Sequence, residues 1–296
     1  MLKIADANPM INMAQRAWLS NQQVTWKTLQ DYFHANADMY LDEMEANDKT
    51  GPGVLELRPN MDVPDYTRYE IHIQPGGYVG DPFAGHVYHY GTNSFYISVL
   101  GHNEQDQIHQ NVTDRLPLPA DGKVKRILDM GCGVGQMTTA LKERFPDAEV
   151  WGVDIGGPMV RYAHMRANDI NSGANFRQAL AEDTGFPAGY FDLVTSYIMH
   201  HEVPAEKTLE IIEEANRVTR PGGVYAPLDF VSRGNRPGPI SKLHGGWWGH
   251  RWNNEVWILS YQSIDFSEEI AKRGFKRIEG AKPIAPQFGD RKFVKV

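Results

Sequence analysis

The residues whose types and spacing best fit a chemical role lie in the stretch RILDMGCGVGQ, residues 126–136. A short apolar run there contains an acid near its end and is followed by Gly131, Gly133 and Gly135. Glycine lets the backbone come close to a ligand, because it lacks a Cβ and tolerates unusual φ and ψ angles. Such a turn between a strand and a helix can hold a dinucleotide or S-adenosylmethionine (SAM).

The spacing of the residues around the turn indicates which of these two ligands fits better. A dinucleotide site requires the pattern G-x-G-x-x-G, and the position of its third glycine is Gln136 here. Asp129 stands two residues before the first glycine, where a carboxylate would oppose a pyrophosphate but suits the ammonium and sulfonium groups of SAM. The pattern therefore favours SAM. A glycine-rich turn alone is a common feature, so the flanking motifs must carry the assignment.

Acids also follow the next two predicted strands. Asp154 directly follows the predicted strand 149–153. At this place a carboxylate binds the ribose hydroxyls of a nucleotide. It indicates a nucleoside ligand without distinguishing NAD from SAM. Glu182 and Asp183 follow the segment 175–179, where polar groups can reach an adenine edge. We expect Asp183 to accept a hydrogen bond from the exocyclic amine, and the alternative is a solvated loop acid.

The elements that position these residues alternate between strand and helix from Lys123 onward. This alternation predicts an α/β fold with a Rossmann-like, mostly parallel sheet and helices on both faces. The last two strands are expected to form an antiparallel hairpin that completes a seven-stranded sheet. The predicted strands cover residues 126–130, 149–153, 175–179, 191–196, 223–229, 275–279 and 292–296.

Two parts of the chain are distinguished by their patterns. Residues 1–116 are predicted to form an N-terminal helical and aromatic-rich lobe on the substrate side, and residues 117–296 the ligand-binding domain with a cap insertion at about 231–262. Apolar residues between Trp26 and Met44 recur at helical steps, so the first 50 residues are expected to be helical.

The segment 69–96 is dense in aromatic residues, glycine and histidine. We expect short strands and turns here that cover an organic ligand, with Tyr88 and Tyr90 as substrate contacts. His86 and His89 have a spacing that two metal ligands can adopt, but no cysteine or closely spaced third ligand accompanies them. We therefore predict no metal.

The cap insertion carries a concentration of tryptophan, a residue that buries a large area and offers a flat face. A lid over an apolar or aromatic substrate is one interpretation, and a place in the core is the other. The predicted substrate contacts in the cap are Trp247, Trp248 and Trp252.

Five segments in order, DMGCGVG, VWGVD, AED, FDLVTSYIMHH and RPGG, resemble the motifs of class I SAM-dependent methyltransferases. Within that family the chain looks most like the small-molecule enzymes of the ubiquinone/menaquinone type and of natural-product pathways. The likeness covers about residues 105 to 230. It implies SAM as the cofactor, held at its methionine part by the glycine loop, at its ribose by Asp154 and at its adenine by Glu182 and Asp183. The predicted cofactor-binding residues are Asp129, Gly131, Gly133, Gly135, Gln136, Asp154, Ile155, Glu182, Asp183 and Tyr197.

The predicted catalytic residues are His200, His201 and Asp229, which follow the fourth and fifth strands of the α/β region. Ligands of open α/β sheets bind beyond the carboxyl ends of the strands. Histidine supplies a base near neutral pH, and a carboxylate can orient its ring and stabilise its charged form. This arrangement resembles that of sugar O-methyltransferases, which favours O-methylation. A similar His pair shapes the pocket in enzymes that methylate carbon, so a C-methyltransferase on an isoprenoid, quinone or polyketide-like acceptor is the alternative.

Composition limits the other classes of function. The net charge of −7 argues against a nucleic-acid partner, and the residues SYIM after the fourth strand differ from the proline-containing motif of enzymes that methylate nucleobase amines. Cys132 is the only cysteine, so no intrachain disulfide can form and a cytoplasmic location is expected. No apolar run approaches the ~20 residues of a membrane span.

These limits leave a small-molecule acceptor as the expected partner, and a homo-oligomer is compatible with the chain. A protein that binds SAM without transferring a methyl group is the alternative from another class.

Overall fold

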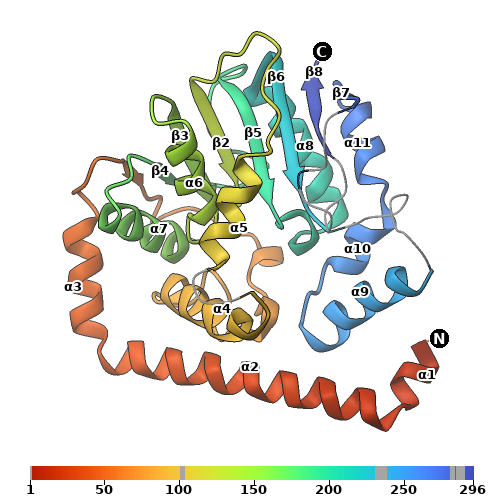
Figure 1. Cartoon of the computed structure of the whole chain (residues 1–296). Helices are drawn as coiled ribbons and strands as arrows, with labels where there is room; N and C mark the ends of the chain where they lie inside the picture. The colour runs from red at the N-terminus through yellow and green to blue at the C-terminus, as the bar shows by residue number, and fades with distance from the viewer. Residues whose placement is uncertain (1, 101–103, 231–238, 281–283, 285–290) are drawn as a thin grey trace.

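The computed structural model describes residues 2–100, 104–230, 239–280, 284 and 291–296. Within these ranges eight strands form one sheet, in the order β1-β4-β3-β2-β5-β6-β8-β7 (Figure 1). The first six strands of this order pair in parallel, whereas β8 lies antiparallel between β6 and β7. The strands are β1 (Leu55–Glu56), β2 (Arg126–Met130), β3 (Glu149–Asp154), β4 (Asn175–Gln178), β5 (Phe191–Tyr197), β6 (Thr219–Leu228), β7 (Phe275–Arg277) and β8 (Phe293–Lys295).

The predicted α/β architecture and the antiparallel C-terminal strands are confirmed. Strand β1 was not predicted and comes from the N-terminal lobe, where Leu55 pairs in parallel with Phe176 of β4. The two segments can come this close because Gly53 has no side chain: a Cβ there would lie 2.0 Å from the carbonyl oxygen of Ala174. The lobe is therefore joined to the sheet edge by main-chain pairing.

Helices cover both faces of the sheet, as predicted for this fold (Figure 1). Helices α5 and α6 pack on one face, and α8 and α11 on the other. The α-helices are α1 (Leu2–Ala7), α2 (Pro9–Ala35), α3 (Ala37–Asn47), α4 (Ala84–Leu100), α5 (Glu104–Thr113), α6 (Gln136–Arg144), α7 (Gly157–Asp169), α8 (Ala205–Val218), α9 (Pro239–Trp252), α10 (Ile258–Ser263) and α11 (Phe266–Lys272); the short 3₁₀ helices are η1 (Asp65–Thr67), η2 (Ile71–Ile73) and η3 (His200–Glu202).

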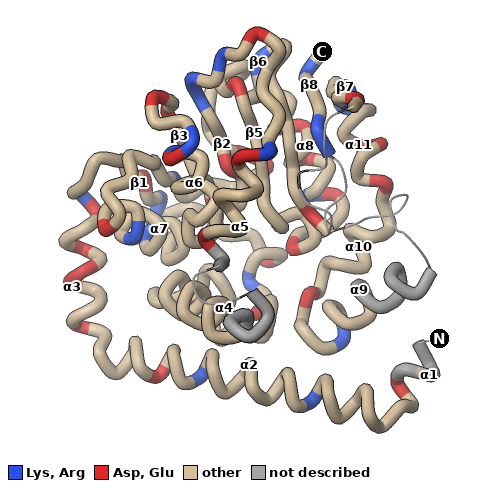
Figure 2. The backbone as a smooth tube through the Cα atoms, viewed as in Figure 1, with Lys and Arg blue, Asp and Glu red and all other residues tan. Residues whose placement is uncertain are grey.

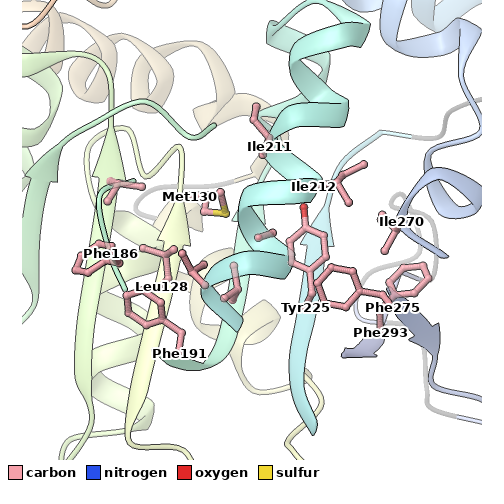
Figure 3. Packing of buried hydrophobic residues seen from close by; sticks show 14 of the residues in the cluster. Leu128, Met130, Phe186, Phe191, Ile211, Ile212, Tyr225, Ile270, Phe275 and Phe293 are labelled. Atoms are coloured by element: carbon pink, nitrogen blue, oxygen red, sulfur yellow. The ribbon is translucent and has the colours of Figure 1, made fainter. Parts of the chain in front are cut away.

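The alternation of side chains along the central strands divides the core into two layers. Ile127 of β2 faces Leu141 and other residues on the α5 and α6 side. Its neighbour Leu128 faces the opposite layer, where Ile211 and Ile212 of α8 pack against the sheet (Figure 3). Because both faces are apolar, polar groups of the strands gather at their ends, which is where the site lies.

The N-terminal lobe is helical, as predicted for the first 50 residues, but its aromatic-rich segment differs from expectation. Short strands were predicted within residues 69–96, whereas α4 begins at Ala84 and turns, bends and short 3₁₀ helices precede it. The aromatic residues of this segment favour strands by propensity, but packing against neighbouring helices outweighs that preference. Gly91 of α4 lies against Trp26 of α2, and a Cβ on it would be 2.0 Å from that ring.

The predicted cap contains two helices, α9 and α10, while residues 231–238 lie outside the described part. Helix α10 packs beside η3 at the end of β5. Acidic and basic residues are interspersed along the chain (Figure 2). Among the described residues, no helix is both long and apolar enough to cross a membrane.

Candidate active site

The glycine loop lies between β2 and α6, and its three glycines all adopt left-handed backbone angles. The φ values are +69° at Gly131, +52° at Gly133 and +79° at Gly135, a region that other residues rarely adopt. Gly131 is also packed closely, because a Cβ there would lie 2.6 Å from the sulfur of Met199. The loop therefore presents bare backbone toward the carboxyl ends of β2 and β3.

Asp154, at the end of β3, is bound to this loop. Its Oδ2 accepts from the backbone N–H of Gly133 at 2.9 Å, and its Oδ1 accepts from the N–H of Gly156 at 2.8 Å. Burial raises the pKa of Asp154, and the two N–H donors oppose this shift. The carboxylate lines a cavity together with Ile155 and Glu182, both predicted cofactor contacts.

Asp129 lies on the other side of Gly131 and is fully buried. Its Oδ2 accepts from the hydroxyl of Thr138 at 2.7 Å, while its Oδ1 has no hydrogen-bond partner among the described residues. Burial raises the pKa of this carboxyl to about 7, with a smaller contribution from the nearby Asp154. A buried carboxylate oxygen without a partner fits the ammonium of a methionine moiety, as predicted for this position.

Two cavities meet at Gly131, which lines both. The first, which we call the nucleoside pocket, is lined by Asp154, Ile155, Ala181, Glu182, Met199 and Glu202, with Tyr66, Ile71 and Tyr78 of the N-terminal lobe on its other side. The second, the methionine-side pocket, is lined by Asp129, Gly133, Gln136, Tyr197, Tyr88 and His109. This division matches a ligand with a nucleoside at one end and an amino acid at the other.

The structure separates the two acids predicted to meet adenine. Glu182 lines the nucleoside pocket, and one of its oxygens accepts from the hydroxyl of Tyr66 at 2.5 Å. Lys207 lies 3.4 Å from the same oxygen. Asp183 is exposed to solvent. The adenine role expected of Asp183 is therefore better placed on Glu182.

Gln136 and Tyr197 both line the methionine-side pocket, as their assignment to the cofactor site requires. The side-chain N–H of Gln136 donates to Asp106 of α5 at 2.8 Å, so this residue ties α5 to the loop. The ring of Tyr197 lies 4.5 Å from that of His109, and burial raises the pKa of its hydroxyl to about 12.

Of the two predicted catalytic histidines, His201 pairs with Asp229. Its Nδ1 lies 2.8 Å from Asp229 Oδ1, and both side chains are almost fully buried. Burial alone would lower the pKa of His201, but the charge and the hydrogen bond of Asp229 raise it to about 9. At neutral pH the ring is therefore an imidazolium and already holds a proton, which does not suit the general base expected here.

His200 points into the core on the α8 side. Its Nε2 lies 3.1 Å from the hydroxyl of Tyr225, and its ring packs 4.5 Å from that of Phe266. Burial lowers the pKa of His200 to about 3. This position gives no support to the predicted base role of His200 and fits a packing role.

Of the two tyrosines predicted to contact the substrate, only one lines a pocket. Tyr88 lines the methionine-side pocket. Tyr90 is 54% exposed and packs its ring against Phe33, 5.7 Å away. It does not reach the pocket, because it lies on another face of α4.

One of the three tryptophans of α9, Trp248, packs against α2. Trp248 donates to the side chain of Gln15, and its ring lies 6.5 Å from Trp18. Trp252 stacks under the guanidinium of Arg251 at 5.4 Å, and Trp247 is partly buried on the same helix. None of the three lines the two cavities at Gly131, and the contacts of Trp248 fit the core interpretation.

Several site residues were not predicted. Tyr66, Tyr78 and Glu202 line the nucleoside pocket, and His72 lies beside Glu202 and Glu255 without lining it. Glu202 directly follows the predicted His pair and could have been found there. The others come from distant segments without a motif. Among the described residues no group of three or more His, Cys, Asp or Glu could hold a metal ion.

A mostly parallel sheet with this strand order, a glycine loop after β2 and a buried acid after β3 form the arrangement expected of a class I, SAM-dependent methyltransferase domain. Residues 127–223 match the family model described as a methyltransferase domain. The chain thus carries this domain, within a longer sequence that the family model leaves unmatched at both ends.

Curated relatives match the same region. A demethylmenaquinone methyltransferase of Thermus thermophilus is 39% identical over 107 residues, covering 36% of this chain and 47% of the relative. A ubiquinone biosynthesis O-methyltransferase of Pseudomonas aeruginosa is 32% identical over 113 residues, covering 38% of this chain and 45% of the relative. The chain spans about half the length of these curated relatives.

Among solved structures, one of a methyltransferase from Bacillus halodurans is similar with a TM-score of 0.49 and 18% identity. It covers 58% of this chain and 70% of that one.

Proposed function

We propose that this chain binds SAM and transfers its methyl group to a small, apolar or aromatic organic acceptor, with a hydroxyl oxygen as the favoured methyl-accepting atom. The observation that carries the proposal is the pair of cavities that meet at Gly131. One contains Asp154, bound to the glycine loop, and the other contains Asp129 with a buried, unpartnered oxygen. This arrangement supports one SAM molecule with its ribose at Asp154 and its ammonium at Asp129.

The residues would divide the cofactor between them. Asp129 would receive the ammonium, the backbone at Gly131 and Gly133 would lie along the methionine part, Asp154 would bind the ribose and Glu182 the adenine. The sulfonium of SAM supplies an electrophilic methyl group when it is bound. The protein then contributes alignment of donor and acceptor and exclusion of water.

The acceptor is proposed to lie on the side of the N-terminal lobe. Tyr78 and Tyr88 come from that lobe and line the two cavities, and their rings meet edge to face at 5.7 Å. Aromatic walls of this kind favour a flat or apolar molecule. The names of the relatives from Thermus thermophilus and Pseudomonas aeruginosa also support a small-molecule acceptor.

Calorimetry with SAM and with S-adenosylhomocysteine tests the cofactor assignment. We expect saturable binding of both by the wild-type protein and a large loss in Asp129→Asn. An absence of binding by the wild-type protein would remove the basis of the proposal.

Release of S-adenosylhomocysteine in the presence of hydroxylated quinones and phenols tests the reaction. Carbon methylation of the same acceptors would favour the C-methyltransferase alternative on an isoprenoid, quinone or polyketide-like molecule. Tight SAM binding with no release in any acceptor mixture would favour a SAM-binding protein that transfers no methyl group.

A further inference from the structure

A group of ionisable side chains from separate segments adjoins the nucleoside pocket. His72 of η2 places its Nε2 3.7 Å from Glu202 and 3.6 Å from Glu255, which lies between α9 and α10. His201 lies 4.0 Å from the same oxygen of Glu202 and pairs with Asp229 on its other side. The N-terminal lobe, the cap and the methyltransferase domain thus each contribute to one charged cluster.

Glu202 is the carboxylate of this cluster that faces the ligand. It lines the nucleoside pocket together with Gly131 and Asp154, and its side chain keeps 18% of its surface exposed. The side chains of Glu255 and Asp229 are 7% and 0% exposed, respectively. A molecule in the pocket beside the cofactor would therefore meet Glu202 and not the other two carboxylates.

The charges of the cluster distinguish Glu202 in a second way. The pKa of His72 is raised, because Glu255 and Glu202 outweigh the effect of burial. The pKa values of Glu255 and Asp229 are lowered by their histidine partners, against the effect of burial. The pKa of Glu202 is raised by burial, which outweighs the charges of His72 and His201.

The two histidines with raised pKa values thus each face a carboxylate with a lowered pKa, Glu255 beside His72 and Asp229 beside His201. Glu202 is the third carboxylate of the cluster, the one that lines the pocket and the one whose pKa is raised. A neutral hydroxyl acceptor must lose a proton when it is methylated, and a carboxylate in contact with it can receive that proton.

We propose that Glu202 is the general base of the methyl transfer and that His72 and His201 are positioning residues that hold it. This inference rests on the proposed function. The acceptor oxygen forms a bond to the methyl carbon as the sulfur–methyl bond breaks. The electron pair of that bond stays on sulfur, which becomes the neutral thioether of S-adenosylhomocysteine. The hydroxyl proton moves to Glu202 and leaves to solvent after product release.

The backbone around the cluster is held in a way that fits a positioning role. The carbonyl of His72 accepts from Gln22 and from Trp26 of α2, both at 2.9 Å. His72 itself adopts a left-handed φ of 56°, and Asn253 donates to Glu255 at 2.9 Å. These bonds fix the backbone at His72 and the side chain of Glu255, and the hydroxyl of Tyr78, 2.9 Å from Nδ1 of His72, orients the ring.

The test uses the full chain with SAM and a series of phenols as probe acceptors. The variant is Glu202→Gln, and the matched control is Glu206→Gln, an exposed glutamate on the first turn of α8. For phenols that are neutral at the assay pH, we expect E202Q to lower kcat by about 100-fold or more. For dinitrophenol, already a phenolate at neutral pH, E202Q should retain the wild-type rate to within about threefold, since no proton has to be removed.

The outcomes separate this inference from the proposed function. Equal losses for neutral and ionised phenols, or no loss for either, would overturn the base assignment. A wild-type protein that binds SAM but methylates none of the phenols would also overturn it, and would leave the SAM-binding proposal standing. Failure to bind SAM would instead reject the proposed function itself.

A pH profile of His72→Asn tests the positioning role, because asparagine tolerates the left-handed backbone. Glu202 is faced by His72 from η2, by Tyr78 from the N-terminal lobe, by Glu255 from the cap, by Asp229 directly after β6 and by its neighbour His201. Loss of the His72 charge should raise the pKa of Glu202, so the acid limb of kcat/KM should move to higher pH. A uniform loss of rate with an unmoved limb would mean that His72 is only structural.

Discussion

Asp154 accepts a hydrogen bond at 2.9 Å from the backbone N–H of Gly133, 21 residues earlier in the chain. The acid predicted to bind ribose therefore also fixes the loop predicted to hold the methionine part. Its other oxygen accepts from Gly156 at 2.8 Å. One carboxylate thus couples the ends of β2 and β3, and a change in it should affect both the loop and the ligand.

Asp154→Asn replaces one of these accepting oxygens by a donor that faces a backbone N–H. We expect SAM to bind roughly 10- to 100-fold more weakly, since hydrogen bonds to charged groups contribute about 1.5–3 kcal/mol. Calorimetry measures the change. Asp147→Asn, in an exposed turn before β3, is the control and should bind like the wild type. Equal affinities of D154N and the wild type would mean that Asp154 does not meet the ligand.

Asp129 should make the unliganded protein less stable as pH rises from about 4 to 7. Its pKa is raised by burial from 3.8 to about 7, so the folded state keeps a proton that the unfolded state has released. The stabilising effect is complete below the unfolded pKa and is lost as pH rises through the folded value. The total is on the order of 4 kcal/mol. Unfolding by urea across this range should show a steeper decline for the wild type than for Asp129→Asn.

Binding of SAM should release a proton below neutral pH. Asp129 is protonated there in the free protein, and only its ionised form pairs with an ammonium group. The affinity should therefore fall as pH falls below about 7, the pKa of Asp129. Calorimetry in buffers with different heats of ionisation measures the released proton. A binding enthalpy that is independent of the buffer would place the ammonium away from Asp129.

The motifs near the strand ends were enough to predict which residues the fold would bring together on the ligand side of the candidate site. The glycine loop, Asp129 and Asp154 are local signals, because each follows a strand whose apolar run can be recognised. Glu182 was predicted as a pair with Asp183, and only the fold shows which of them turns inward. The charged cluster had no such signal, because His72 and Glu255 are brought to Glu202 by tertiary packing of the lobe and cap.

The same dependence on tertiary packing explains why α4 was not predicted as a helix. Its aromatic residues suggested strands, but the pattern of buried positions depends on α2 and α7 lying on either side. Gly85 fits against Tyr162 of α7 and Gly91 against Trp26 of α2, and a Cβ would be 2.4 Å and 2.0 Å from those side chains, respectively. Glycines that appear to break a helix are here the positions where it touches its neighbours.

Gly91→Ala should therefore destabilise the protein, although alanine favours helix. The added methyl group would overlap the ring of Trp26, and overpacking of this kind costs about 1–3 kcal/mol. Chemical denaturation gives the loss in unfolding free energy. Gly122→Ala is the control, because a Cβ there meets nothing within 4 Å and only its left-handed φ opposes it. A G91A protein as stable as the wild type would contradict the close contact between α4 and α2.

The His201–Asp229 pair should contribute stability that disappears at alkaline pH. The pKa of His201 is raised from 6.5 to about 9, because Asp229 outweighs burial. A histidine with a raised pKa stabilises the folded state fully below pH 6.5, and this contribution is lost as pH rises through about 9. It amounts to about 3 kcal/mol.

Asp229→Asn removes the charge that holds this proton. The variant should be less stable than the wild type at pH 6 and should lose little more stability as pH rises to about 9. His72 also has a raised pKa. Because His72 is present in both proteins, the difference between their curves of stability against pH reports on His201. Urea unfolding at a series of pH values gives both curves. If the stability curves of the two proteins run parallel, Asp229 does not hold the proton on His201. His201 would then again be a candidate for the general base, besides Glu202.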